Sequence, residues 1–446
     1  MNLTSLVADA GIVGCGGAGF PTHVKLKGTY EYFIINGAEC EPLLRNDRYL
    51  MREKAKEIIL AAAYVAKELG IPHTVVALKR HYEEETAALE KAISDLGASV
   101  QLCLMDSFYP AGDEQTIVYE VTGRVVPPAG LPGEVGAVVD NVATVYAIYQ
   151  AMQGLPLTHR FLTVTGEVNH PVVLKVPVGT PFTYCIRLAG GARIPDFYVV
   201  SGGPMMGKPV YDVENAVVTK TTSGILVLKK DCRHANANAI EIPHMLNRAR
   251  SACIQCTQCT QLCPRHMLGH PIEPHKIMRK AAVSTDILSM LDDPDVRNAQ
   301  LCCECGVCET FACPMGLQPR RINSLIKQAL GKNKIRYERS QSAYEASPLR
   351  DSRKAPSGKV AARAGVYKYN DYEIRDFLSD EPEAVSIPLK MHVGAPCVPT
   401  VAVGDMVQTG KLIATPPAGA LGANIHASIT GRVTDITGDR ITIMKK

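Results

Sequence analysis

The sequence predicts a protein of several domains in the mixed α/β class. Strand-like and helix-like segments alternate over residues 33–153, which is typical of an α/β domain with a parallel sheet. Two cysteine-rich segments follow in the middle of the chain, and Val/Ile strands punctuated by glycines fill residues 388–446. A chain of 446 residues is too long for one ordinary core, so we expect two to four domains.

Composition and charge narrow the class of protein. Hydrophobic residues make up 46% of the chain and charged residues 21%, as in ordinary soluble proteins. A net charge of +4 without a long Lys/Arg block gives no reason to expect nucleic acid as a partner. No run approaches the roughly 18 apolar residues of a membrane span, and residues 1–4 do not resemble the start of a signal peptide. We expect a cytoplasmic protein without a transmembrane segment.

The N-terminal part alternates predicted strands and helices. Residues 32–35 form a short apolar run, whereas 52–69 and 82–96 have helical periodicity. Gly70 and Gly97 follow these two helices, in the position where glycine commonly ends a helix. This order predicts a parallel sheet covered by helices.

A glycine-rich segment, Gly14-Cys15-Gly16-Gly17-Ala18-Gly19, precedes the first predicted strand. Glycines let backbone N–H groups close on phosphate oxygens or on a flat ring. The spacing also matches the dinucleotide pattern G-x-G-x-x-G, with Glu39 near the place of a ribose-binding acid. That pattern requires a preceding strand, whereas residues 3–12 read as a helix, so a standard Rossmann site is disfavoured. A glycine-rich turn without a ligand remains the alternative.

Two cysteine motifs carry the most specific chemistry. The first motif is Cys253, Cys256, Cys259 and Cys263-Pro264, and the second is Cys302, Cys305, Cys308 and Cys313-Pro314. Such runs are typical of paired [4Fe–4S] clusters in which the last cysteine of each motif ligates the other cluster. We therefore predict cluster 1 on Cys253, Cys256, Cys259 and Cys313, and cluster 2 on Cys263, Cys302, Cys305 and Cys308.

Three alternatives to this assignment remain. Zinc also takes four cysteines, although its sites usually combine two Cys-x2-Cys pairs separated by a longer insert. The second motif has four residues, 309–312, before its last cysteine where three are usual, and Cys303 competes with Cys302 as a ligand. His266, His270 and His275 lie near the first motif, where we expect local hydrogen bonds rather than ligation.

The rest of the chain changes pattern twice. Residues 160–228 contain short β-rich segments separated by Gly/Pro turns, which predicts a small β-containing domain. Residues 274–290, between the cysteine motifs, read as helical. Residues 331–380 are polar and read as a linker or surface segment, and residues 388–446 predict a compact β-sandwich.

Four N-terminal motifs resemble a known family. They are residues 14–22 (GCGGAGFPT), 36–42 (NGAECEP), 109–114 (YPAGDE) and 141–144 (NVAT). In this order they are similar to the flavin-site motifs of the NADH-binding subunit of respiratory complex I and of the C subunit of the Rnf complex. The resemblance implies FMN as a cofactor and NADH as a substrate.

By position, the resemblance assigns a set of site residues. The implied cofactor-binding residues are Gly14, Gly16, Gly17, Gly19, Lys25, Asn36, Gly112, Asp113, Asn141 and Thr144. The implied catalytic candidates, lining the nicotinamide pocket, are Glu39, Glu41 and Glu114. A carboxylate near the ribose would repel a 2′-phosphate, so we expect NADH rather than NADPH. A solvated Lys25 is the alternative to a phosphate-binding one.

The resemblance also implies a domain order. It gives a Rossmann-like FMN/NADH domain at 1–155, a β-grasp domain of the SLBB type at 156–235 and an α-helical double [4Fe–4S] domain at 240–332. A linker at 333–385 and a lipoyl-like barrel-sandwich hybrid at 386–446 follow. The barrel-sandwich has no lysine where lipoate or biotin would attach, so we expect an unmodified docking or structural module.

A barrel-sandwich at the C-terminus is most similar to the cobalamin reductase family of propanediol-utilisation microcompartments. The resemblance implies that electrons pass from NADH through FMN and two [4Fe–4S] clusters to cobalamin. It further implies a corrinoid adenosyltransferase and microcompartment shell proteins as partners, and a place inside a bacterial microcompartment. An Rnf-like or microcompartment NADH dehydrogenase with another acceptor, and a non-catalytic electron relay, are the alternatives; the oligomeric state is open.

Overall fold

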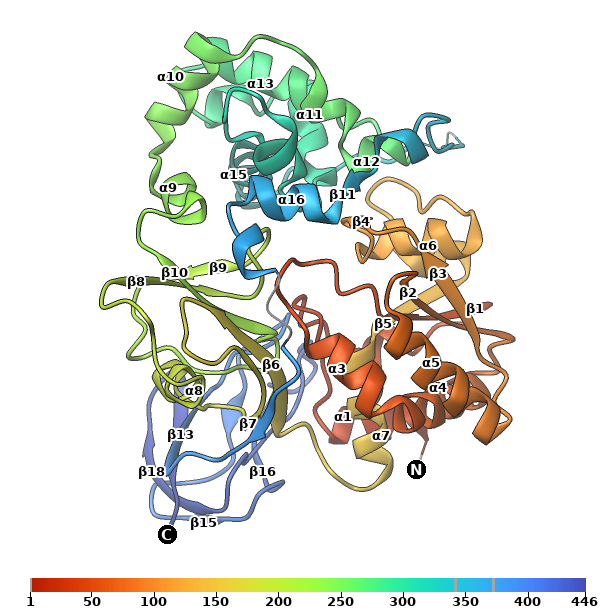
Figure 1. Ribbon diagram of the computed structural model, residues 1–446, viewed down its shortest axis with the longest axis vertical. Coiled ribbons are helices and arrows are strands. Elements are labelled where there is room, and N and C mark those ends of the chain that lie inside the picture. The colour runs from red at the N-terminus through yellow and green to blue at the C-terminus, as the bar shows by residue number, and fades with distance from the viewer. Residues whose placement is uncertain (1, 341–342, 371–373) are drawn as a thin grey trace.

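The computed structural model describes residues 2–340, 343–370 and 374–446 (Figure 1). Its N-terminal domain is built on a parallel sheet with strand order β3-β2-β1-β5. The strands are β1 (Tyr32–Asn36), β2 (His73–Lys79), β3 (Gln101–Met105) and β5 (Ala137–Asn141). The helices are α1 (Leu3–Asp9), α2 (Thr22–Lys25), α3 (Asn46–Glu53), α4 (Ala55–Leu69), α5 (Glu83–Leu96), α6 (Glu114–Thr122) and α7 (Val142–Met152). The predicted parallel sheet and its helices are confirmed.

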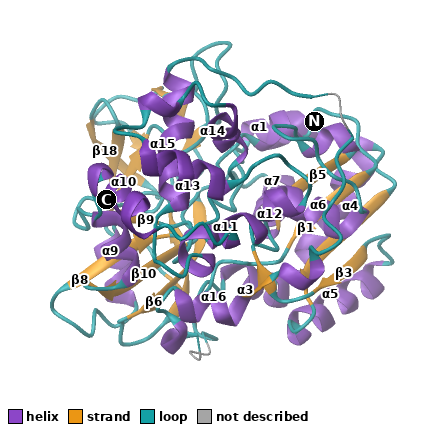
Figure 2. Cartoon of the chain, turned by 90° about the horizontal axis from the view of Figure 1, so that it is seen from above, coloured by secondary structure: helices purple, strands orange, loops and turns teal. Residues whose placement is uncertain are grey.

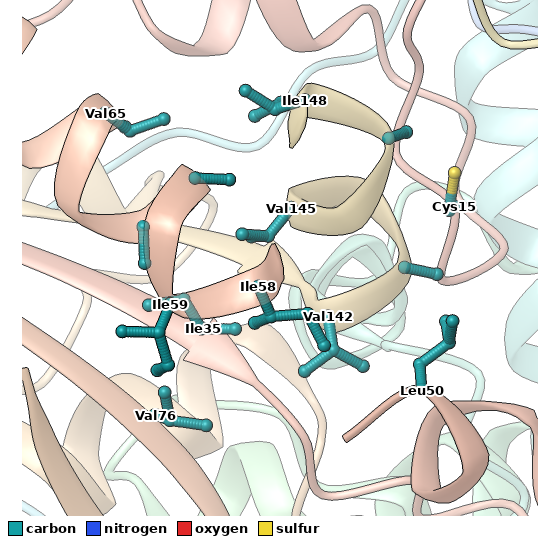
Figure 3. Close-up of a cluster of buried hydrophobic side chains, with 14 of the residues drawn as sticks. Cys15, Ile35, Leu50, Ile58, Ile59, Val65, Val76, Val142, Val145 and Ile148 are labelled. Carbon is teal, nitrogen blue, oxygen red and sulfur yellow. The ribbon is translucent and has the colours of Figure 1, made fainter. Parts of the chain in front are cut away.

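Helices cover both faces of this sheet because successive strand residues point to opposite sides. Ile35 of β1 packs against α4 and α7, and Figure 3 shows it near Ile59 and Val142. Ile34 faces the other side and belongs to the core under α6. The glycines expected to end two helices, Gly70 and Gly97, have φ of +64° and +57° and cap α4 and α5.

A second sheet forms the next domain, with strand order β12-β7-β6-β10-β8-β9. Its strands are β6 (His159–Gly166), β7 (Val172–Pro177), β8 (Phe197–Ser201), β9 (Lys208–Val210), β10 (Gly224–Lys229) and β12 (Phe377–Ser379). The helix α8 (Phe182–Leu188) packs its Phe182, Cys185 and Ile186 against the strands, in a core of its own.

The cysteine motifs lie in a helical domain at the top of Figure 1. Its helices are α9 (Arg233–Ala239), α10 (Ile242–Ala252), α11 (Gln258–Gln261), α12 (Pro264–Met267), α13 (Pro274–Val283), α14 (Pro294–Arg297) and α15 (Pro319–Lys332). The helical prediction for 274–290 holds for α13 and for a short 3-10 turn at Leu288–Met290. Seen from above, α10, α11, α13 and α15 group together (Figure 2). Across the described residues, no helix has the length and apolar character required to cross a membrane.

Two small sheets form the C-terminal domain, as the glycine-punctuated pattern predicts. Their orders are β13-β19-β18-β15 and β14-β16-β17, around one shared core. The strands are β13 (Ala384–Pro388), β14 (Val398–Pro399), β15 (Met406–Val407), β16 (Leu412–Thr415), β17 (Ile425–His426), β18 (Gly431–Ile436) and β19 (Arg440–Met444). The domain touches the glycine-rich segment, since the Val393 N–H donates to Gly19 O over 2.9 Å.

The segment expected as a linker, 333–385, contains packed structure; its residues 341–342 and 371–373 lie outside the described range. The strand β11 (Ala355–Pro356) pairs with β4 (Phe108–Tyr109) of the N-terminal domain, and α16 (Ser357–Arg363) follows it. The strand β12 extends the second sheet beside β7. The segment is polar overall, but a few of its apolar residues, such as Val360 and Tyr369, are buried and pack it against the rest of the protein.

Candidate functional site

The glycine loop, residues 14–19, lies at the carboxyl edge of the N-terminal sheet. Asn36 and Asn141 end the neighbouring strands β1 and β5 and stand opposite one another in register. Here the strand order reverses, because β2 follows on one side of β1 and β5 lies on the other. Open α/β sheets bind their ligands outside the carboxyl ends of the strands at this point. The topology therefore brings the predicted glycine loop, Asn36 and Asn141 together at the sheet edge where a ligand site is expected.

The glycine loop presents backbone to solvent. The Cys15 N–H donates to Thr144 Oγ1 over 2.9 Å, which fixes the loop on α7. Gly16 and Gly17 are exposed, and Gly17 has a φ of +111°, with no heavy atom within 4 Å of where a Cβ would stand. This open backbone fits a ligand that takes N–H hydrogen bonds.

The two asparagines hold the ends of the strands. The Asn36 amide donates to Gly112 O over 2.9 Å and accepts from the Ala38 N–H. Asn141 Oδ1 accepts from the Ala143 N–H and caps α7. A Cβ on Gly112 would lie 3.2 Å from Cys40 Sγ, so this turn packs closely against the strand ends. These contacts hold the ends of β1 and β5 and the turn at Gly112 in fixed positions.

Two of the predicted catalytic carboxylates bind backbone of this protein. Glu39 accepts from the Asp47 and Arg48 N–H groups at the start of α3, at 2.8 and 3.3 Å. Glu41 accepts from the Met205 and Met206 N–H groups, at 2.9 and 2.7 Å. Burial raises the pKa of Glu39, with a contribution from the Asp47 carboxylate, and burial likewise raises the pKa of Glu41, each to about 7.

Lys25 and Glu114 form an ion pair, with 2.6 Å between Nζ and Oε1. Asp140 lies 3.8 Å from the same ammonium, and burial raises the pKa of this carboxyl to about 6. Burial alone would lower the pKa of Lys25, but Asp140 and Glu114 outweigh it and raise the value. Asp140 Oδ2 and Gln115 Oε1 are buried without a hydrogen-bond partner among the described residues. Such orphaned acceptors fit a site that is completed by a ligand.

The four cysteines predicted for cluster 1 line one pocket. Cys253, Cys256, Cys259 and Cys313 surround it together with His275 and Met278. Within the described part of the chain, no three His, Cys, Asp or Glu side chains are arranged to hold a single metal ion. A pocket lined by four cysteines fits the predicted [4Fe–4S] cluster, which takes one thiolate per iron. His275 hydrogen-bonds to Thr260 Oγ1 at 2.8 Å, a local contact as expected.

The cysteines predicted for cluster 2 also come together. Burial raises the pKa of Cys308, and Cys302 and Cys263 lie close enough to raise it further. Cys303 is a neighbour of both Cys263 and Cys305. The choice between Cys302 and Cys303 as the ligand therefore stays a prediction.

The extra residue of the second motif is accommodated by a π-helical turn at Val307–Ala312. In the first motif, Cys259 and Cys263 are four residues apart; Cys259 lies in α11, an ordinary helical turn, and Cys263 follows that helix. Cys308 and Cys313 are five residues apart, the interval of a π-helical hydrogen bond. The wider turn absorbs the insertion, and π-turns are frequent at functional sites.

Three contacts join the N-terminal domain to the cysteine motifs. Arg265, directly after Cys263-Pro264, pairs with Asp113 at 2.9 Å, and both side chains are 11% exposed. The buried Tyr109 donates its hydroxyl to Cys305 O over 2.7 Å, and His270 Nε2 lies 2.9 Å from Val126 O. Sequence reasoning missed Arg265 and Asp140. The available signals were a charged residue directly after Cys-Pro and a charged residue directly after the apolar run 137–139.

Comparison with protein families agrees with this organisation. Residues 7–150 match the Nuo51 FMN-binding domain, 161–209 the SLBB domain, 252–318 a 4Fe-4S dicluster domain and 368–446 the RnfC barrel sandwich hybrid domain. The fold class expected from the sequence is thereby confirmed.

Two relatives match nearly the whole chain, and a third matches part of it. Cobalamin reductase PduS of Salmonella typhimurium is 40% identical over 98% of this chain and 95% of the relative, and that of Citrobacter freundii is 38% identical over the same shares. The C subunit of the Na(+)-translocating ferredoxin:NAD(+) oxidoreductase complex of Acetobacterium woodii is 36% identical over 59% of this chain and 58% of its own. The chain therefore belongs to the cobalamin reductase PduS family of flavin and iron–sulfur oxidoreductases.

Proposed function

We propose that the protein oxidises NADH at an FMN in its N-terminal domain and passes single electrons through two [4Fe–4S] clusters to cobalamin. A flavin joins the two halves of this reaction because it accepts a hydride and releases electrons singly. The family membership and the FMN-binding and 4Fe-4S domains support this function.

The main structural support for this proposal is the contact between Asp113 and Arg265, which links the predicted flavin site to cluster 2. Asp113 follows Gly112 in the predicted flavin site, and Arg265 follows Cys263, a predicted ligand of cluster 2. A buried ion pair between them holds the two sites in a fixed arrangement. We infer that electrons reach cluster 2 first, and that cluster 1, whose Cys256 is exposed, delivers them to the acceptor.

The three acidic residues of the predicted pocket differ in how free their carboxylates are. Because Glu39 and Glu41 already accept from backbone N–H groups, we propose that they shape the nicotinamide pocket rather than exchange protons. Glu114 is 38% exposed beside Lys25 and has the freer carboxylate. A carboxylate that is ionised near the ribose favours NADH over NADPH, since its negative charge disfavours a 2′-phosphate.

The partners follow from the proposed product. Reduced cobalamin would serve a corrinoid adenosyltransferase that regenerates adenosylcobalamin. We propose that the protein works inside a bacterial microcompartment, next to its shell proteins. Co-purification with shell proteins, rather than with membranes, would support this location.

The test is anaerobic and follows each centre separately. The protein is reconstituted with iron, sulfide and FMN, and NADH is added with excess cob(III)alamin while flavin, cluster and corrinoid absorbances are recorded. We expect flavin bleaching followed by cob(II)alamin or cob(I)alamin, and loss of the corrinoid step in Cys256→Ala. An oxidised corrinoid beside reduced clusters would point to another acceptor, and an unbleached flavin would favour a non-catalytic relay.

A further inference from the structure

A cavity of about 240 Å³ lies beside the cluster domain, away from the glycine loop. It opens where α9 meets the turn at 204–205 and the loop that follows Cys313. Figure 1 shows α9 between the strands β8–β10 and the helix α10. The side chains that matter below are Arg233, Arg248, Arg320, Glu309 and Gln318.

The cavity carries an excess of positive charge. Arg320 lies 3.5 Å from the Glu309 carboxylate, whereas Arg233 and Arg248 hydrogen-bond to backbone carbonyls, at 3.4 and 3.0 Å. Burial lowers the pKa of Arg233, and the neighbouring Arg363 guanidinium lowers it further. Three guanidiniums thus face one carboxylate in the cavity wall, a balance that attracts an anion.

A second observation points to a ligand with a donor group. Gln318 is 4% exposed and lines the cavity, and its Nε2 donates to Gly316 O over 2.9 Å. Its Oε1 has no hydrogen-bond partner among the described residues. A buried acceptor without a partner is unfavourable, so it favours a ligand that brings an N–H or O–H group.

The cavity adjoins both predicted clusters. Glu309 and Thr310 line it and stand between Cys308 of cluster 2 and Cys313 of cluster 1. Leu317 lines both this cavity and the cluster 1 pocket, so the two adjoin at this residue. A molecule bound here lies where an electron acceptor is needed.

We propose that this cavity binds a phosphate ester group of the electron acceptor, with the arginines on the phosphate and Gln318 on an adjoining N–H or O–H. Planar guanidiniums suit phosphate oxygens because they donate in pairs. The inference rests on the proposed function only for the identity of the acceptor. The phosphodiester of a corrinoid's nucleotide loop and a free phosphate are two sources of the same chemistry.

Binding is measured first on the reconstituted holoprotein by calorimetry at low ionic strength, with inorganic phosphate and pyrophosphate as probes. We expect Arg248→Gln and Arg320→Gln each to weaken binding by about tenfold. Arg250→Gln is the matched control, because Arg250 is exposed on α10 and donates to Ala282 O. Unchanged binding in both cavity variants would overturn the proposal, as would a shift of the cluster potentials, read by redox titration, without any change in anion binding.

The source of the phosphate is then tested with two corrinoids. Cobalamin carries the nucleotide loop and cobinamide lacks it. If the corrinoid occupies the cavity, the variants raise KM for cobalamin by about tenfold and leave cobinamide reduction unchanged. Equal effects on both corrinoids, with phosphate binding still lost, would assign the cavity to a different phosphate ester. If no corrinoid is reduced at all, the proposed function fails. The calorimetry still decides whether the cavity binds phosphate.

Discussion

Breaking the ion pair between Asp113 and Arg265 should uncouple the flavin domain from the clusters. Asp113→Asn is the sharpest change, because asparagine caps a helix as well as aspartate and so preserves the start of α6. It leaves the guanidinium of Arg265, whose residue is 9% exposed, without its carboxylate. Removing one partner of a buried pair costs about 3–5 kcal/mol.

A double-mutant cycle tests this link directly. Arg265→Gln and the double variant complete the cycle, and we expect a coupling energy between about 1 and 3 kcal/mol. The chain has no tryptophan, so urea unfolding is followed by circular dichroism, with flavin release as a second probe. Stopped-flow reduction by NADH should show slower cluster reduction in both single variants, and Arg265→Gln, which lies outside the predicted flavin site, should leave flavin bleaching normal. Additive losses with unchanged cluster reduction would refute the reasoning.

Three further predictions concern separate features. Burial lowers the pKa of Lys220 from 10.5 to about 8, so the unfolded chain binds more protons between these values. Stability should therefore rise by up to about 3 kcal/mol from pH 8 to 10.5, and a Lys220→Met variant that kept this rise would contradict it. Cys302→Ser should remove about half of the reconstituted iron, measured chemically and by electron paramagnetic resonance, whereas Cys303→Ser should retain it; the reverse pattern would exchange the two ligands. Because the φ of Gly17 is +111°, Gly17→Ala should raise the FMN dissociation constant roughly tenfold. Gly331→Ala in α15 is the control and should leave that constant unchanged. Equal FMN affinities in the two variants would count against the glycine loop as the flavin-binding loop.

The sequence alone predicted those features that depend on the spacing of residues close together in the chain. Helix ends at Gly70 and Gly97 and the apolar run that became β1 follow from local periodicity and backbone preference. The cysteine motifs likewise predicted which thiolates would meet around the cluster 1 pocket. These features depend on residues close in sequence, or on a ligand chemistry that few residue types supply.

The tertiary structure decided the rest, because long-range contacts leave no periodic trace in the sequence. Residues 333–385 read as a polar linker, yet β11 pairs with β4 and β12 extends the second sheet beside β7, each strand pairing with a segment far earlier in the chain. Glu41 was expected to line the nicotinamide pocket, and the fold also brings the Met205 N–H to its carboxylate. The sequence by itself indicated iron–sulfur chemistry, since thiolate spacing is local, and the resemblance of its glycine-rich and acidic motifs implied FMN. Only the folded chain could decide that Arg265 connects the two centres, because its partner lies 152 positions away and burial makes their pairing strong.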